Sequence, residues 1–254
     1  MKYVSADEAV KLVKSGDWVF FQGSTAVPVI IQEALARRAD ELRGVNIVSG
    51  FNITKAPAPF CRPEYKESFF VNSLFLCADQ REYVAQGYGS LIPGFLGELP
   101  SLIRRHEIPV DVACINCSLP DENGYCSYNI SADLAQPAVE SAKIVIAQVN
   151  KSIPYLYGTA MIHESQITAA VECDDPPVDM QFGPPTEIES AIGSYIAAEI
   201  PDGATLQIGV GGIPNATLNG LKDHKHLGLH TEAMTDGVFR LMQSGVIDNS
   251  LKKI

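Results

Sequence analysis

Two segments of the chain carry the same order of elements: a short apolar strand, a glycine turn that ends in proline, and a helix. In the first segment, WVFFQ (18–22) leads into GSTAVP (23–28). In the second, ATLQIG (204–209) leads into GVGGIP (209–214), so that both the glycine and the proline of the turn recur 186 residues later. This spacing predicts two copies of one architectural unit. Two unrelated turns of similar sequence are the alternative.

The first strand, WVFFQ, begins with a continuous apolar run, which is typical of a parallel sheet covered by helices on both faces. Such strand–helix–strand units cross over right-handed and place their loops at the carboxyl edge of the sheet, where ligands bind. We therefore predict an α/β fold of two Rossmann-like open α/β domains related by internal duplication. Besides the strand at 18–22, strands are expected over 45–51, 69–78, 110–116 and 144–149, and helices over 29–42, 99–106 and 132–142.

A change of composition marks the domain boundary. The segment DDPPVDMQFGPP (174–185) is rich in Pro, Asp and Gly, which indicates a linker. We predict an N-terminal α/β domain over 1–180 and the start of a C-terminal α/β domain over 181–254, opening with a helix at 187–200. Fewer than 70 residues follow the linker, too few to finish a Rossmann-like layer. We expect the rest of that domain to come from further sequence, in the same or another chain.

Charge and apolar content exclude several classes of partner. The net charge of −11 is spread along the chain, so neither nucleic acid nor an anionic membrane surface would attract the protein. No apolar run approaches the ~20 residues that span a bilayer. The N-terminal 17 residues, with Ser5 as N-cap and Glu8 three residues later, predict a capped helix and not a signal peptide. We expect a soluble, cytoplasmic protein.

The six cysteines sit mostly inside apolar runs, so we interpret them as buried reduced thiols. Cys114 and Cys117 form one CxxC, but no second pair completes a zinc site. His224, His226 and His230 cluster in sequence without converging on an ion. No metal is expected.

The glycine-rich segment GVGGIPNA (209–216) is the first candidate for chemistry. Closely spaced glycines after a strand let backbone amides approach a ligand, and the helix that follows adds its partial positive charge. The pattern is not the dinucleotide fingerprint, because Pro214 follows and no acidic ribose partner lies at the expected place. Its amides could form an oxyanion hole, with a plain tight turn as the alternative. The residues concerned are Gly209, Val210, Gly211, Gly212, Ile213 and Asn215.

The second candidate is Glu232 in LGLHTEAMTDG (227–237). The short strand predicted at 227–231 brings this glutamate to its carboxyl end. A lone glutamate there could equally be a helix cap or a solvated residue. If the strands at 204–209 and 227–231 are neighbours, however, Glu232 and the glycine loop face one crevice at the same sheet edge.

The motifs in their order resemble one family. The segment 202–221, followed by LGLHTEAMTDGV, is similar to the acetyl-CoA hydrolase/transferase family, the family I CoA-transferases of the 4-hydroxybutyrate and butyryl-CoA:acetate type. The N-terminal motifs agree in order: IPGFLGELP (92–100), SLPDENGYCSYNISAD (118–133) and the segment 146–167. The resemblance extends over essentially the whole chain. Family members are longer, with a second half that runs well beyond the glutamate motif.

The resemblance implies that Glu232 is the catalytic nucleophile of a ping-pong CoA transfer between short-chain carboxylic acids, of the acetate, butyrate and 4-hydroxybutyrate class. The reaction passes through a glutamyl-CoA thioester. It implies acyl-CoA and a carboxylate as substrates, no cofactor besides coenzyme A as substrate, and a homo-oligomer. An acyl-CoA hydrolase that uses the same glutamate, and a catalytically incomplete acyl-CoA-binding fragment, are the alternatives.

The resemblance also suggests a substrate pocket, to which the first glycine turn would contribute from across the domain interface. His163 is interpreted as a core histidine, with a ligand-facing base as the alternative. The pocket residues are Gly23, Ser24, Thr25, Gly94, Phe95, Leu119 and Pro120.

Overall fold

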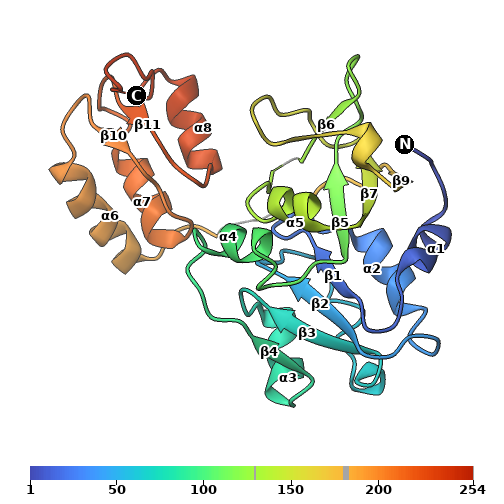
Figure 1. The fold of residues 1–254 in the computed structure, drawn as a ribbon. Coiled ribbons are helices and arrows are strands. Elements are labelled where there is room, and N and C mark those ends of the chain that lie inside the picture. The colour runs from blue at the N-terminus through green and yellow to red at the C-terminus, as the bar shows by residue number, and fades with distance from the viewer. Residues whose placement is uncertain (129, 180–182, 254) are drawn as a thin grey trace. The chain divides into compact units, whose positions relative to one another are not determined.

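The computed structural model describes residues 1–128, 130–179 and 183–253, which fall into two compact units. Unit 1 comprises Met1–Asp179 and unit 2 comprises Met180–Ile254 (Figure 1). Each unit has its own hydrophobic core and is described by itself. Within the described residues, no helix has both the length and the apolar character needed to cross a membrane.

Unit 1 is built on a seven-stranded sheet in the order β4-β3-β2-β1-β5-β7-β9. All neighbouring strands are parallel, which confirms the predicted α/β class. A separate antiparallel pair joins β6 to β8. The strands are β1 (Trp18–Phe21), β2 (Val45–Ser49), β3 (Phe69–Ser73), β4 (Gly89–Leu91), β5 (Val112–Cys117), β6 (Tyr125–Ser127), β7 (Ile144–Asn150), β8 (Met161–His163) and β9 (Ala169–Cys173).

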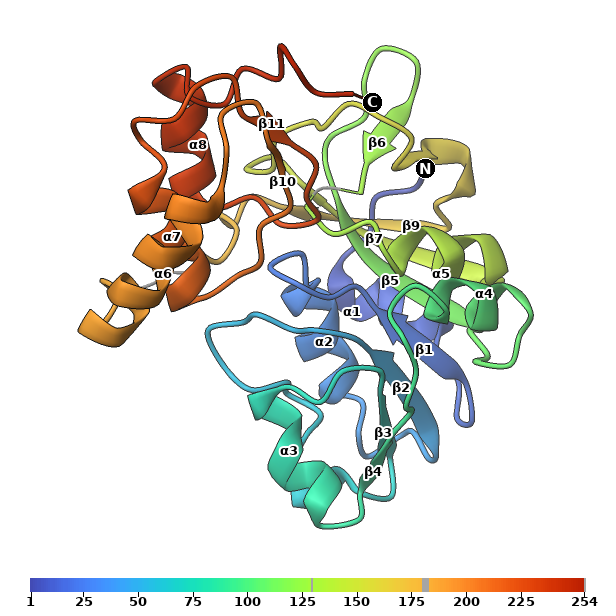
Figure 2. The same ribbon diagram turned by 90° about the vertical axis from the view of Figure 1, so that its left-hand side faces the viewer.

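Helices cover both faces of this sheet, and each face has a core of its own. In β1, Val19 and Phe21 belong to one core whereas Phe20 belongs to the other, because successive side chains of a strand point to opposite faces. This burial on both faces explains why most positions of the strands are apolar. Figures 1 and 2 show α1 (Ala6–Ala9) and α2 (Val29–Ala36) on one face, and α4 (Leu99–Arg104) and α5 (Ala135–Ser141) on the other.

The strand order reverses between β1 and β5. From β1 the chain builds β2, β3 and β4 outward to one edge, then returns to pair β5 with the other side of β1. The loops that follow β1 and β5 therefore diverge, and in open α/β sheets such a switch point leaves a crevice at the carboxyl ends of the strands. The buried Gln22 fixes the end of β1 here: its Oε1 accepts from the Asn116 amide at 2.7 Å, and its Nε2 donates to the carbonyls of Tyr128 and Ser131.

Several expected elements are shorter than the sequence indicated. The strand expected over 69–78 ends at Ser73, and α3 (Ala78–Ala85) begins where the apolar run FLCA suggested more strand. The helix folds back on the sheet, because Gln80 Nε2 donates to Ser49 Oγ at 2.7 Å and the Tyr83 hydroxyl donates to the Phe69 carbonyl at 3.0 Å. An apolar run alone does not separate a strand end from the first turn of a buried helix.

The remaining differences concern short elements. The helix expected over 29–42 ends as α2 at Ala36 and continues as turns. The N-terminal helix is α1 followed by a 3₁₀ turn, η1 (Val10–Leu12); Ser5 caps it as predicted, accepting from the Glu8 amide at 3.2 Å. Two further 3₁₀ turns are η2 (Pro63–Tyr65) and η3 (Glu164–Gln166). Strands β4, β6, β8 and β9 were not predicted.

Unit 2 pairs two short parallel strands, β10 (Thr205–Leu206) and β11 (Gly228–Leu229), with three helices. The order α6–β10–α7–β11 repeats the order α1–β1–α2–β2 of unit 1, and in both units the two strands are parallel neighbours. Common descent of the two units stays a prediction. The helices are α6 (Glu187–Glu199), α7 (Gly212–Gly220) and α8 (Asp236–Gln243).

Close packing of α6 against α7 holds unit 2 together. Gly193 of α6 lies so near α7 that a Cβ there would approach the Ala216 carbonyl carbon to 2.7 Å. Gly220 of α7 faces α6 in the same way, where its Cβ would meet the Ala197 Cβ at 2.8 Å. Small residues at a helix crossing let the backbones come close, and the apolar side chains beside them form the core under β10 and β11.

Candidate active site

The carboxyl ends of β10 and β11 are tied together by one hydroxyl. Thr231 Oγ1 accepts from the Ile208 amide at 3.1 Å. Its one hydrogen is shared between the Ile208 carbonyl at 2.9 Å, which is the nearer acceptor, and the Ala233 carbonyl at 3.1 Å. The His230 amide adds a bond to the Leu206 carbonyl at 2.8 Å. Glu232 and Gly209 each follow immediately after one of the joined residues, Thr231 and Ile208. The expected adjacency of the glutamate and the glycine loop is therefore present in unit 2.

The glycine loop leaves a set of backbone donors unused. Gly211 is the N-cap of α7 and has no side chain to cap the helix. Within the described residues, no hydrogen-bond acceptor takes the amides of residues 209–213, and Asn215 N donates to the Gly211 carbonyl at 3.1 Å. Uncapped amides at a helix start, with the positive end of the helix dipole behind them, favour a negatively charged or polarised oxygen.

Gly211 gives this loop its shape. Its φ of 141° and ψ of −177° lie in a region that is essentially restricted to glycine. Val210 and Ile213 are exposed beside it. The loop therefore exposes its backbone, with few side chains over it. The alternative of a plain tight turn does not require this exposure.

Glu232 is exposed in a bend between β11 and α8. Within the described part of the chain, no hydrogen bond or salt bridge engages its carboxylate, so neither a helix-capping nor an ion-pairing role accounts for it. Thr235, the N-cap of α8 three residues later, keeps its Oγ1 buried without a partner. The segment around Glu232 therefore holds polar groups that the fold itself does not use.

A second carboxylate lies against the same loop. A Cβ on Gly212 would collide with the Glu189 carboxylate, which shows that this group lies directly beside the start of α7. Glu189 is held by the Thr186 amide at 2.7 Å and by the Thr186 hydroxyl at 2.9 Å. These bonds, the amide first, hold the pKa of Glu189 below its usual range. Glu189 is thus a charged wall of the glycine loop, which the sequence did not single out.

In unit 1, the three residues predicted from the first glycine turn have different roles. Gly23 lies against the Phe51 carbonyl, which a Cβ would approach to 2.6 Å, and the Ser24 amide donates to that same carbonyl. Ser24 also accepts from the Ile53 amide at 3.0 Å and adopts a positive φ of 56°. Both residues join the turn to the loop after β2. Of these three residues, Thr25 lines the cavity described next.

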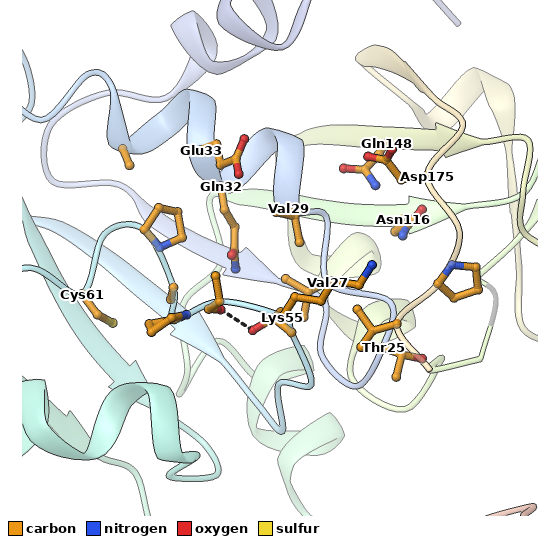
Figure 3. Close-up of a pocket in the computed structure, with 18 of the residues that line it drawn as sticks. Thr25, Val27, Val29, Gln32, Glu33, Lys55, Cys61, Asn116, Gln148 and Asp175 are labelled. Carbon is orange, nitrogen blue, oxygen red and sulfur yellow. Dashed lines mark hydrogen bonds between the residues drawn. The ribbon is translucent and has the colours of Figure 1, made fainter. Parts of the chain in front are cut away.

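That cavity, of about 770 Å³, lies wholly within unit 1 at the carboxyl ends of β1, β5 and β7 (Figure 3). One wall is α2, presenting Val29, Gln32 and Glu33, and another is the loop over 54–59. The floor includes Asn116 of β5 and Gln148 of β7, which are register partners. Sequence reasoning missed these two amides. Their signal was a polar residue near the carboxyl end of each of two strands that are otherwise apolar.

The other predicted pocket residues separate. Leu119 and Pro120 line a second cavity of about 670 Å³, together with Tyr155 and Tyr157. Gly94 and Phe95 line neither of these cavities; Phe95 is 79% exposed, and its carbonyl accepts from the Glu98 amide before α4.

The cysteine and histidine candidates have structural surroundings. Cys114 packs in the core on one face of the sheet and Cys117 in the core on the other, since residues three apart on a strand point to opposite sides. This CxxC therefore does not present two thiols to one ion. His163 is a partly exposed cap, not a core residue: its Nδ1 accepts from the Ser165 amide at 3.3 Å. His226 pairs with Asp248 at 2.8 Å, and His224 Nε2 lies 2.9 Å from the Ile200 carbonyl.

Comparison with known proteins identifies the family. The chain is 39% identical over 253 residues to the 4-hydroxybutyrate coenzyme A transferase of Clostridium kluyveri, matching 100% of this chain and 58% of that protein. It is 38% identical to the succinyl-CoA:cyclohexane-1-carboxylate CoA transferase of Geobacter metallireducens, with 99% and 57% covered. The chain thus spans somewhat more than half the length of these relatives.

A solved structure agrees. The crystal structure of 4-hydroxybutyrate CoA-transferase from Porphyromonas gingivalis superposes with a TM-score of 0.84 at 35% identity, covering 100% of this chain and 59% of that one. Residues 1–180 match the model of the acetyl-CoA hydrolase/transferase N-terminal domain. The resemblance inferred from the motifs is confirmed, and the chain belongs to the acetyl-CoA hydrolase/transferase family.

Proposed function

We propose that the protein is an acyl-CoA:carboxylate CoA-transferase in which Glu232 is the nucleophile. The observation that carries the proposal is the Thr231 hydroxyl, which holds the Glu232 segment against the strand that leads into the unpaired amides of residues 209–213. An exposed carboxylate beside a set of free amides has what acyl transfer needs: an attacking oxygen and donors for the charge that develops on the thioester oxygen.

The reaction would proceed in balanced steps. The Glu232 carboxylate attacks the thioester carbonyl, the carbon–sulfur bond breaks, and the CoA thiolate leaves an acyl-glutamyl anhydride. The thiolate then attacks the glutamyl carbonyl and releases the first acid, so the enzyme carries a glutamyl-CoA thioester. A second carboxylate reverses the two steps and leaves as the new acyl-CoA. Thioester and anhydride are both activated acyl groups, so no ATP enters the balance.

The free amides of the glycine loop would stabilise the oxyanion of each tetrahedral intermediate. Removing one such donor typically lowers the rate by about 10²–10³-fold. The names of the relatives, CoA transferases in both cases, support transfer to a carboxylate over hydrolysis. Short-chain acids as substrates, the remaining part of the family fold as a partner, self-association and a cytoplasmic location are parts of the same proposal.

Intact mass spectrometry tests the nucleophile directly. Incubation with acyl-CoA should add one CoA to the protein, and borohydride should remove it. Glu232→Gln should abolish this adduct, whereas Glu199→Gln, an exposed glutamate at the end of α6, should leave it unchanged. An adduct that persists in Glu232→Gln would place the nucleophile elsewhere.

The acceptor dependence separates transferase from hydrolase. A transferase should form a new acyl-CoA from the acceptor acid, with release of the first acid, only when a carboxylate acceptor is present. CoA release at the same rate without an acceptor would identify a hydrolase.

A further inference from the structure

The helices α6 and α7 of unit 2 pack side by side in a fixed register (Figures 1 and 2). Gly193 of α6 lies against Ala216 of α7, and one turn further along both helices Ala197 lies against Gly220. The partners advance in the same direction, so the two helices run parallel. Small residues at each contact let the backbones come close, and the N-terminal ends of both helices lie together.

This register places the carboxylate of Glu189 at the start of α7. Glu189 comes one helical turn before Gly193, and Gly212 comes one turn before Ala216. Gly212 has no side chain, and a Cβ added to it would collide with the Glu189 carboxylate. The carboxylate therefore lies against the backbone that presents the free amides of residues 209–213.

The charge of Glu189 is held in position. Its carboxylate accepts from the amide and the hydroxyl of Thr186, whose Oγ1 accepts from the Glu189 amide at 3.2 Å, and these bonds form a capping box. The same bonds to the carboxylate, the amide first, lower the pKa of Glu189, so the group is ionised at neutral pH. Within the described residues, no lysine, arginine or histidine forms a salt bridge with it. The glycine loop thus has a negative charge beside donors that attract anions.

We infer that Glu189 is a specificity-determining residue of the candidate active site, and that its charge keeps free carboxylates and other small anions off the glycine loop. Unpaired amides at a helix start attract any anion. A like charge in contact with the same backbone opposes that attraction. A neutral carbonyl oxygen, such as that of a thioester, has no net charge for Glu189 to repel.

The consequence for catalysis rests on the proposed function. When Glu232 attacks a neutral thioester, one negative charge passes from its carboxylate to the thioester oxygen. The total charge that Glu189 faces is therefore the same before and after the attack. A free anion bound to the loop would instead add a second negative charge beside Glu232. Glu189 accordingly discriminates against free anions more strongly than it opposes the attack.

Titration with acetate in the absence of acyl-CoA tests the inference on the purified chain. Amide chemical shifts of residues 209–213, followed by NMR at low and constant ionic strength, report binding at the loop. Glu189→Gln should bind acetate at least about fivefold more tightly than the unaltered protein, and the difference should shrink at about 1 M salt, which screens exposed charges. Equal affinities at low ionic strength would overturn the inference.

Matched variants separate the charge from the fold. Glutamine serves in a capping box as glutamate does, so Glu189→Gln keeps the acceptor for Thr186. Glu189→Asp keeps the charge and should bind acetate as weakly as the unaltered protein. Glu187→Gln removes an exposed charge from the same turn of α6 and should leave the affinity within about twofold. An equal gain in Glu187→Gln would show an effect of net charge alone and would overturn the inference.

A structural role for Glu189 predicts a different result. If its carboxylate only caps the helices, Glu189→Gln and Glu189→Ala will lower the melting temperature and leave the acetate affinity unchanged, which would refute the inference. Tighter acetate binding in either neutral variant supports it, so the test does not depend on the stability of one of them.

Inhibition by sulfate, which is not an acyl acceptor, extends the test to the reaction. The sulfate concentration that halves the rate of CoA adduct formation should fall at least about fivefold in Glu189→Gln, with a smaller change in the rate without sulfate. An adduct that persists in Glu232→Gln, with the acetate difference intact, would refute the nucleophile and leave the role of Glu189 in anion binding standing. An adduct that depends on Glu232, with equal acetate affinities, would do the reverse.

Discussion

Replacing Thr231 by valine should separate the two halves of the candidate active site. Valine has nearly the shape of threonine but lacks the hydroxyl through which Thr231 joins the Glu232 segment to Ile208. The substitution leaves the amide and the carbonyl of Ile208 without this partner in a position where Ile208 itself is buried. Because Thr231 is only partly buried, water will replace some of the lost bonding.

The loss follows from the bonds that are removed. The hydroxyl of Thr231 accepts one hydrogen bond from Ile208 and donates one to it, and each such bond has a net value of about 0.5–1.5 kcal/mol. Because water reaches this partly buried position, we expect the free energy of local opening at this edge of unit 2 to fall by about 1–2 kcal/mol. That energy changes the open population about 5–30-fold. We therefore expect the Ile208 amide to exchange about 5–30-fold faster, and the glutamyl-CoA adduct to form more slowly because the nucleophile is no longer held beside the glycine loop.

Hydrogen exchange followed by NMR or mass spectrometry measures this opening at Ile208. Thr205→Val is the matched control, because Thr205 lies on β10 and its hydroxyl makes no hydrogen bond within the described residues. If both variants exchange at Ile208 as the unaltered protein does, the Thr231 hydroxyl does not hold the site together, and the observation that carries the proposed function fails.

Three other substitutions test the packing and the electrostatics of the two units. Gly211→Ala should destabilise the loop by about 1–3 kcal/mol, because its φ of 141° is unsuited to a side chain, and chemical denaturation with adduct formation would report both losses. Gly193→Ala should cost about 1–3 kcal/mol by overpacking, since its Cβ would press on α7; an unchanged denaturation midpoint would contradict the packing. Asp111 accepts from the Trp18 amide at 3.0 Å, and this bond first, then Lys143, lowers its pKa. Its carboxylate therefore adds stability above the ordinary aspartate pKa of about 3.9 that is lost as the pH falls through the lower folded-state pKa. Asp111→Asn should be less stable than the unaltered protein at pH 7, and this difference in stability should shrink as the pH falls below about 3.9; a difference independent of pH would rule out this linkage.

Local sequence patterns predicted many of the strands, but not where each strand or helix begins and ends. The largely apolar strands expected over 18–22, 45–51, 110–116 and 144–149 all correspond to observed strands, because a strand buried on both faces is apolar at most of its positions. The strand predicted over 69–78 was too long, because β3 ends at Ser73. The apolar residues that follow lead into α3, a helix that packs on the sheet. Strands β4, β6 and β8 have three residues each, too few for periodicity to reveal them.

The candidate active site was predicted in part, and the cavity residues mostly were not. Glu232 and the glycine loop were visible because a glutamate after a strand, and a run of glycines before a helix, are local features. Gln32, Lys55 and Asn116 come from a helix, a loop and a strand that are distant in sequence. Neither their unpaired atoms nor their common cavity follows from any one segment, because both depend on what the rest of unit 1 places around them.

The sequence by itself determined the α/β class, the two glycine turns and the motifs of the family, since each depends on residues that are neighbours along the chain. Within the described residues, the tertiary structure decided which groups are left without partners, among them the amides of residues 209–213, Gln32 Nε2 and Asn116 Oδ1. Whether a polar group is satisfied depends on every segment packed around it. That property belongs to the folded unit, and the candidate active site is argued from it.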